Sequence, residues 1–191
     1  MGTALLAFDG LPWIEFARLM LYARGHHNDA ALAAMLASRD AGVGALPFGL
    51  GLSPEGYRDM AARHFPHASV TPALDGEAVP AERRAEFDEL LGLLLTHRGS
   101  DDPSVAWMAE IVAVGCLASD HLWQDLGLFA RDELSALMRR NFPRLAARND
   151  RNMKWKRFLY KQLCEAEGIY VCRSPSCEVC TDYAACFGPA D

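Results

Sequence analysis

Apolar residues recur every three to four positions along most of the chain, which is the spacing of one face of an α-helix. In residues 81–96 such a stripe predicts a helix that faces a core, and it consists of Phe87, Leu90, Leu91, Leu94 and Leu95. Residues 104–118 repeat the pattern. No segment of useful length shows the apolar–polar alternation of a half-buried strand. The pattern therefore predicts an all-α protein built as a helical bundle.

Prolines, glycines and capping residues predict where the other helices begin and end. Residues 12–24 should form a largely buried helix, because apolar side chains dominate this segment. Asn28 is a suitable N-cap for a second helix, which should end by Gly42. The remaining expectations are a tight glycine-rich loop at residues 42–51 and helices at residues 53–65, 132–138 and 149–166.

The segment at residues 120–129 differs from its surroundings, because it places polar side chains among leucines. It contains His121, Trp123 and Asp125 within a few positions of one another. Two interpretations stay open. The segment either builds a polar pocket or the outer shell of a site, or it forms a junction between helices in which buried polar groups find hydrogen-bond partners.

Four cysteines near the C-terminus are the strongest chemical signal. They follow a C-x4-C-x2-C-x5-C pattern, and Ser174, Pro175 and Ser176 between them favour a loop. Thiolates at this spacing can converge on one metal centre, and the pattern resembles an iron–sulfur cluster run more than the paired cysteines of most zinc sites. Zinc, disulfides and free thiols remain alternatives. The candidate ligands are Cys172, Cys177, Cys180 and Cys186.

The two other cysteines carry weaker signals. Cys116 lies on the apolar face of residues 104–118 and is expected to be a small buried residue. Cys164 lies about one helical turn before the chain leaves its last expected helix, which makes it an outside candidate for an extra metal ligand.

The length of 191 residues fits one structural domain, with a helical body at 1–168 and a cysteine-rich cluster-binding segment at 169–191. Hydrophobic residues make up 51% of the chain, yet no apolar stretch is long enough to span a bilayer. The first residues also lack the pattern of a secretory signal. We therefore expect a cytoplasmic protein whose cysteines stay reduced, which favours metal binding over disulfides.

The net charge of −6 hides an uneven distribution. Residues 139–161 contain nine basic residues and one acid, a balance of +8, so the rest of the chain carries −14. Such a basic segment just before the cysteines could attract an anion, offset the charge of a thiolate-ligated cluster or dock an acidic partner. The plainer interpretation is a solvated helix face. The residues of interest for an anion are Lys154, Lys156, Arg157 and Lys161.

Several stretches of the chain together resemble the nitrogen-fixation protein family NifQ. They run in order from about residue 45 onward, and the cysteine pattern shows no departure from that of the family. These stretches are Leu46–Leu52, His64–Pro66, Asp120–Gly127, Met153–Cys164, Ser176–Cys180 and Cys186–Gly188.

The resemblance implies a molybdenum-handling protein that serves nitrogenase. In the family, the cysteine run is thought to hold an iron–sulfur cluster that takes up molybdenum as a Mo–Fe–S cluster. The metal then passes to the nitrogenase cofactor-assembly scaffold and to the nitrogenase iron protein, where it enters the iron–molybdenum cofactor. The expected role is therefore that of a metal donor or carrier in cofactor biosynthesis and not that of an enzyme.

Residues outside the cysteine run receive roles within this hypothesis. The basic residues before the run would attract molybdate, which is an oxyanion. In this hypothesis molybdenum takes a ligand beyond the four cysteines of the run. Imidazole is suitable, so His64 and His121 are possible additional ligands, and Cys164 is a further one.

Two alternatives come from other classes of protein. The first is an iron–sulfur electron carrier that never binds molybdenum. The second is a zinc-stabilised interaction module, although the overall acidity argues against nucleic acid as its partner. No nucleophile–base pair or pair of carboxylates stands out, so the sequence gives no support to a conventional enzyme.

Overall fold

The computed structural model describes residues 11–70 and 79–166, and within them the regular structure is entirely helical. This result confirms the expected all-α body for the described part of the chain. The elements are α1 (Leu11–Met20), α2 (Asp29–Asp40), α3 (Pro54–His64), the 3-10 helix η1 (Ala81–Arg83), α4 (Arg84–Thr96), α5 (Pro103–Cys116), α6 (Leu122–Asp125), α7 (Arg131–Asn141), α8 (Pro143–Ala147) and α9 (Trp155–Ala166).

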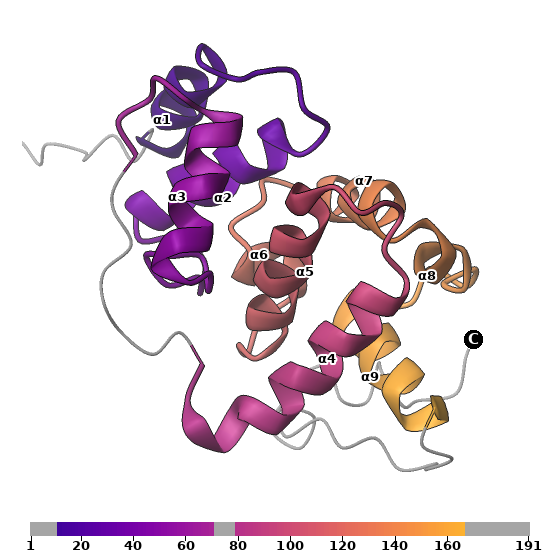
Figure 1. The fold of residues 1–191 in the computed structure, drawn as a ribbon. Helices are drawn as coiled ribbons and strands as arrows, with labels where there is room; N and C mark the ends of the chain where they lie inside the picture. The colour runs from indigo at the N-terminus through magenta and orange to yellow at the C-terminus, as the bar shows by residue number, and fades with distance from the viewer. Residues whose placement is uncertain (1–10, 71–78, 167–191) are drawn as a thin grey trace, which may run out of the picture.

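The helices form groups around a central helix, α5 (Figure 1). Helices α1, α2 and α3 gather at one end of the molecule, whereas α4 and α9 pack together at the other. Helices α7 and α8 contact each other along one side, and α6 joins α5 to α7. Within the described residues, no helix has the length and apolar character needed to cross a membrane.

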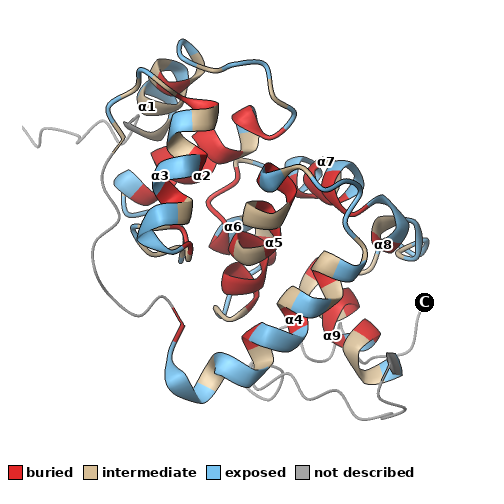
Figure 2. Ribbon diagram, viewed as in Figure 1, coloured by how far each residue is buried: buried red, intermediate tan, exposed pale blue. Residues whose placement is uncertain are grey.

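The central position of α5 follows from its composition, since a helix that is apolar on all sides is stable only when it is surrounded. Met108, Ala109, Ile111 and Val112 are fully buried, and Figure 2 shows buried residues along most of this helix. The carboxylate of Asp102 caps its first turn by accepting a hydrogen bond from the backbone N–H of Ser104 (2.8 Å). Cys116 is buried at its last position, as expected.

Local sequence signals correctly predicted α3. The hydroxyl of Ser53 accepts a hydrogen bond from the backbone N–H of Gly56 (3.0 Å), and Pro54 occupies the first helical position. The helix ends at His64, two residues before Pro66. Asn28 is at the N-cap of α2 as predicted, but its side chain makes no capping hydrogen bond.

Helix α1 differs from the expectation of a largely buried helix. It ends at Met20, before the expected end at residue 24, and the side chains of Trp13 and Ile14 are 59% and 70% exposed. The reason is that α1 is an outer helix that packs on α2, so only one of its faces is covered. Leu19 lies on that covered face and is buried.

The last expected helix begins later than predicted, at Trp155 and not near Asn149. Asn149 forms a closed turn with Met153, because its amide donates to the carbonyl of Met153 (3.1 Å) and its oxygen accepts from the N–H of Met153 (2.8 Å). Asn152 has a left-handed backbone with φ of 51°. A side chain that bonds the local backbone competes with helix formation, so the chain turns here before α9 starts.

The glycine-rich loop at residues 42–51 is structural, as expected. Gly51 has φ of +89°, and a Cβ atom there would lie 2.4 Å from the side chain of Val114. Only glycine accommodates both this backbone conformation and this close approach to α5. The loop is also tied to α6, because the N–H of Ala45 donates to the carbonyl of Asp125 (2.8 Å).

Candidate metal centre

The four cysteines of the C-terminal run lie outside the described residues. The prediction that Cys172, Cys177, Cys180 and Cys186 ligate a metal therefore stays a prediction. The structure does describe α9, the helix that leads the chain toward these cysteines.

The apolar face of α9 fixes this helix to the bundle. Trp155, Phe158, Leu159 and Tyr160 are buried, and the helix packs on α4. The indole N–H of Trp155 donates to the hydroxyl of Ser135 in α7 (3.2 Å). Burial of three aromatic side chains in one helix contributes several kcal/mol, at roughly 25 cal/mol for each Å² of apolar surface removed from water.

A buried ion pair adds a polar attachment between α9 and α6. The ammonium group of Lys156 donates to the carboxylate of Asp125 and to the carbonyl of Ala118 (2.8 Å). The side chains of Asp125 and Lys156 are only 3% and 16% exposed. Burial raises the pKa of Asp125, although Lys156 partly opposes this shift. Of the two interpretations of residues 120–129, the structure therefore supports the helix junction with satisfied buried polar groups at Asp125.

A second polar contact joins α9 to α4. The hydroxyl of Tyr160 donates to the carboxylate of Glu86, which also accepts a hydrogen bond from Arg83 (2.9 Å). Burial is the main cause that raises the pKa of Tyr160, and the same cause raises the pKa of Cys116 to about 12. Cys116 is thus a protonated, buried thiol, in agreement with its expected structural role.

The four residues proposed to attract an anion have different environments. Lys156 contributes its charge to the pair with Asp125, so it stabilises the body whether or not it also influences an anion. Lys154 and Arg157 are half-buried. Lys161 is exposed and lies 3.6 Å from the carboxylate of Glu165, one turn further along α9. Attraction of an anion by these residues stays a prediction.

His64 lies deep in the body, at the end of α3. Its side chain is fully buried, and its Nδ1 atom lies 2.5 Å from a carboxylate oxygen of Asp29. The other oxygen of Asp29 accepts hydrogen bonds from the backbone N–H groups of Gly25 (2.7 Å) and His26 (2.8 Å). Burial lowers the pKa of His64 and Asp29 partly opposes this, so the imidazole is neutral at pH 7.

This arrangement has one feature of a metal ligand, because carboxylates often orient the histidines that bind metals. The Nε2 atom of His64 is buried and has no hydrogen-bond partner within the described residues. However, α3 and α9 belong to opposite ends of the molecule in Figure 1. The immediate surroundings of His64 are the rings of His26 and Trp107, at 5.2 Å and 6.3 Å between ring centroids. A ligand role for His64 stays a prediction.

The other two possible ligands lie on different elements. His121 is exposed at the N-cap of α6, where its side chain makes no capping hydrogen bond. Cys164 is half-buried on α9. Nowhere in residues 11–70 and 79–166 do three or more His, Cys, Asp or Glu side chains converge as a metal site. The described body therefore does not bring His64, His121 and Cys164 together.

Sequence reasoning missed the buried polar network that joins α2, α5 and α7. Asn28 donates to the hydroxyl of Ser104 (2.9 Å) and to the side-chain oxygen of Asn141 (2.8 Å). Asn141 donates in return to the side-chain oxygen of Asn28 (2.8 Å). The polar run of residues 26–29 between two apolar helices was a signal of buried polar groups, but nothing local indicated their partners.

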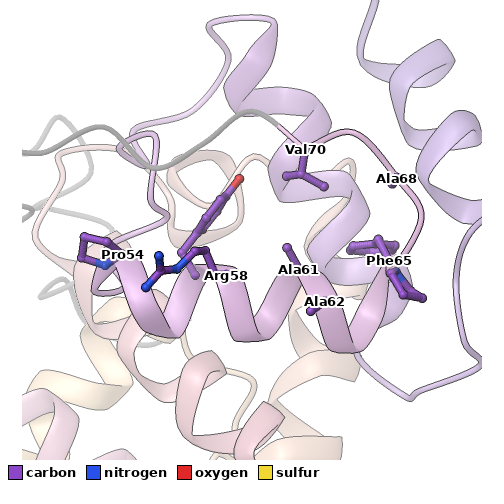
Figure 3. Close-up of a pocket in the computed structure, with 9 residues that line it drawn as sticks. Pro54, Arg58, Ala61, Ala62, Phe65, Ala68 and Val70 are labelled. Carbon is purple, nitrogen blue, oxygen red and sulfur yellow. The ribbon is translucent and has the colours of Figure 1, made fainter.

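A surface pocket of about 460 Å³ lies along α3, and none of the candidate site residues lines it. Figure 3 shows Pro54, Arg58 and Ala61 along the helix and Val70 on the chain that follows it. The lining is mostly apolar, without a convergent group of metal-binding side chains. The pocket therefore adds nothing to the candidate metal centre.

The described helices and the cysteine run together define the class of protein: an all-helical body that leads, through a firmly packed helix, into a candidate four-thiolate metal site. Comparison with known families makes the assignment specific. The family model NifQ matches residues 31–188, a range that includes all four cysteines of the run, and the chain belongs to this family.

Individual relatives agree with this assignment. The chain is 48% identical to Protein NifQ of Azotobacter vinelandii over 172 residues, which cover 84% of this chain and 88% of the relative. It is 42% identical to Protein NifQ of Klebsiella pneumoniae over 156 residues, or 77% of this chain and 90% of the relative. It is 40% identical to Protein NifQ of Rhodobacter capsulatus over 152 residues, which cover 78% of this chain and 81% of the relative. No solved structure matches the chain.

These matches confirm the resemblance inferred from the sequence motifs. Membership of the NifQ family implies a role in nitrogen fixation.

Proposed function

We propose that this chain takes up molybdenum on an iron–sulfur cluster held by its cysteines and donates the metal for biosynthesis of the iron–molybdenum cofactor of nitrogenase. One observation carries the proposal. The match to the NifQ family extends through the C-x4-C-x2-C-x5-C run, so the residues with metal-binding chemistry belong to the shared part of the chain.

The donor set suits this role. Four thiolates favour iron–sulfur clusters over hard cations such as magnesium or calcium. The ligands would be Cys172, Cys177, Cys180 and Cys186, and the cluster would supply sulfide and iron to which molybdenum can bind. A reducing cytoplasm would keep these thiols from forming disulfides. The protein would act as a carrier that releases its cargo and not as a conventional catalyst.

Molybdenum is the cargo and would arrive as molybdate. The basic residues of α9 and the turn before it would raise the local concentration of this oxyanion by electrostatic attraction. Lys161 is exposed and its partner Glu165 is 3.6 Å away, so this weak pair leaves its ammonium accessible to an anion. The recipients would be the nitrogenase cofactor-assembly scaffold and the nitrogenase iron protein.

The body supports the proposal by anchoring α9. Contacts to α4, α6 and α7 fix this helix through Glu86, Asp125 and Ser135. In the sequence, the cysteine run therefore follows a helix that is firmly packed on the body.

The proposal is tested by measuring iron, sulfide, molybdenum and zinc in anaerobically purified protein, together with the visible spectrum. We expect iron and sulfide at about three or four per chain, absorbance near about 400 nm, and molybdenum after supply of molybdate. Replacing any one of the four run cysteines by alanine should lower the iron content. Cys116→Ala is the matched control and should retain the cluster, because Cys116 is buried in α5.

Other outcomes would point to other functions. Iron and sulfide without molybdenum under any loading condition would favour an electron carrier. One zinc ion in a colourless protein would refute both cluster-based functions and favour a zinc-stabilised interaction module. Transfer is tested separately, by following isotopically labelled molybdenum from the loaded chain to the purified scaffold.

A further inference from the structure

The segment at residues 139–151, which includes the end of α7, the short helix α8 and the turn that follows, carries a cluster of five exposed arginines. We call it the arginine face, and it consists of Arg139, Arg140, Arg144, Arg148 and Arg151. All five side chains are exposed, and Figure 2 shows exposed residues on the outer sides of both helices. The structure thus divides the basic segment of the sequence into two parts. Lys156 in α9 is neutralised by Asp125, whereas the arginine face points to solvent.

The arginine face lacks the ion pairs that several other arginines of the body form. Arg63 pairs with Asp102 (2.7 Å) and Arg98 with Asp101 (2.6 Å). Within the described residues, no member of the arginine face forms such a pair. The nearby acid Asp150 is exposed and does not pair with them. This surface therefore has an unbalanced positive charge.

Two of these side chains are held in place by backbone carbonyls from other parts of the fold. Arg140 donates to the carbonyl of His27 (3.2 Å), and Arg144 donates to the carbonyl of Thr96 (3.2 Å). A carbonyl restrains a guanidinium group without cancelling its charge, and each guanidinium has five N–H donors, so several remain available. Restrained side chains lose less conformational entropy when a partner binds.

The chemistry of the surface indicates the kind of partner. Guanidinium groups bind carboxylates in a two-pronged geometry, and arginine is enriched in protein interfaces. The five charges are spread over two exposed helices, whereas a small oxyanion such as molybdate would need converging donors. A nucleic acid is disfavoured because the chain as a whole carries −6. A protein with clustered surface carboxylates fits the observations best.

We propose that the arginine face is the docking surface for the acidic protein that receives the metal. The identity of the recipient rests on the proposed function. The expected contact between arginines and surface carboxylates does not. The arginine face directly precedes α9 in the chain, and α9 leads to the cysteine run. Docking on this surface therefore uses the part of the body that is attached to the start of the metal-binding segment.

The test measures binding of the full metal-loaded chain to purified nitrogenase iron protein and, separately, to the purified cofactor-assembly scaffold. The variant Arg139→Glu/Arg148→Glu reverses two charges of the arginine face that make no described contact. The matched control Arg24→Glu/Arg58→Glu reverses two exposed arginines elsewhere and changes the net charge equally. We expect the first variant to weaken binding of one of these proteins by about tenfold or more. The control should stay within about twofold, and added salt should weaken the native complex.

Several results would overturn the inference: equal weakening by both variants, no weakening by either, or no binding of the native chain to either protein. Preferential loss of binding to a double-stranded DNA probe would indicate a nucleic-acid surface instead. Molybdenum content is measured on the same samples, so the two proposals fail separately. If the Arg139→Glu/Arg148→Glu variant loads molybdenum normally and binds both proteins as the native chain does, the docking role of the arginine face is refuted. If the native chain binds its partner but takes up no molybdenum, the proposed function is refuted.

Discussion

Replacing Lys156 by methionine tests the attachment of α9 in the most direct way. The change keeps a long side chain and its apolar contacts, but it removes the ammonium group that binds Asp125 and the carbonyl of Ala118. The carboxylate of Asp125 stays buried at 3% exposure with its positive partner gone. We expect a large loss of stability together with an increased affinity of Asp125 for a proton.

The magnitude follows from the burial of the pair. Removing one partner of a buried ion pair costs about 3–5 kcal/mol, because an uncompensated charge is left in the interior. Lys156 is 16% exposed, so the lower part of this range applies, at about 3 kcal/mol. The double variant Asp125→Asn/Lys156→Met should lose less than Lys156→Met alone, because the charge that needs a partner is also absent.

The assay is urea unfolding followed by circular dichroism at pH 7. Lys161→Met is the matched control on the same helix, and it should cost less than about 0.5 kcal/mol because the pair with Glu165 is exposed. The pH dependence gives a second readout. Without Lys156, the pKa of Asp125 in the folded state lies further above its value in the unfolded chain, so the cost of the substitution should shrink as the pH falls toward about 4. Equal costs for Lys156→Met and Lys161→Met would refute the reasoning.

The body should also lose stability below about pH 6.5, because burial lowers the pKa of His64 in the folded state and the unfolded chain therefore binds protons more readily. His64→Gln should weaken this dependence in unfolding experiments between pH 7 and 5, and an unchanged pH profile would contradict the assignment. Gly51→Ala should cost about 2 kcal/mol or more in thermal unfolding, because it combines a left-handed backbone with a clash against Val114. Gly92→Ala should instead stabilise α4 by about 0.5–1 kcal/mol, since Gly92 lies in a helix with open space around it. If Gly51→Ala were the more stable of the two variants, the close approach of Gly51 to Val114 would be contradicted.

The sequence predicted those features of the fold that depend on local interactions. Ser53 and Pro54 begin α3 through a hydrogen bond and a dihedral angle that act within four residues. The stripe at residues 81–96 identified α4 for the same reason, because its spacing alone places Phe87, Leu90 and Leu94 on the buried side. Pro143 occupies the first position of α8, a position that proline favours, directly after the end of α7.

The errors arose where distant parts of the chain decide the outcome. Trp13 and Ile14 are apolar, but the number of neighbouring helices determines how much of α1 is covered, and α1 lies at the edge. Asn28 has a side chain suited to capping, yet it binds Asn141, which is 113 residues away. No pattern near Asn28 could identify that partner.

For the candidate site, the sequence suggests a chemistry, which stays a prediction, but not a geometry. The spacing of the four cysteines indicated a metal, and the family match agrees with the order of motifs. The sequence could not predict the pairing of Lys156 with Asp125, because a basic residue on a helix can equally face solvent or a buried carboxylate. Only the packing of α9 against α6 decides between them.

The contacts of α9 also bear on how the protein is made. A chain emerges from the ribosome with its N-terminus first, and domains tend to fold in that order. Glu86 and Asp125, which hold Tyr160 and Lys156, are both synthesised before α9. The four cysteines emerge later still. A newly made chain therefore has the residues that hold α9 before it has α9 itself, and the cysteine run follows last.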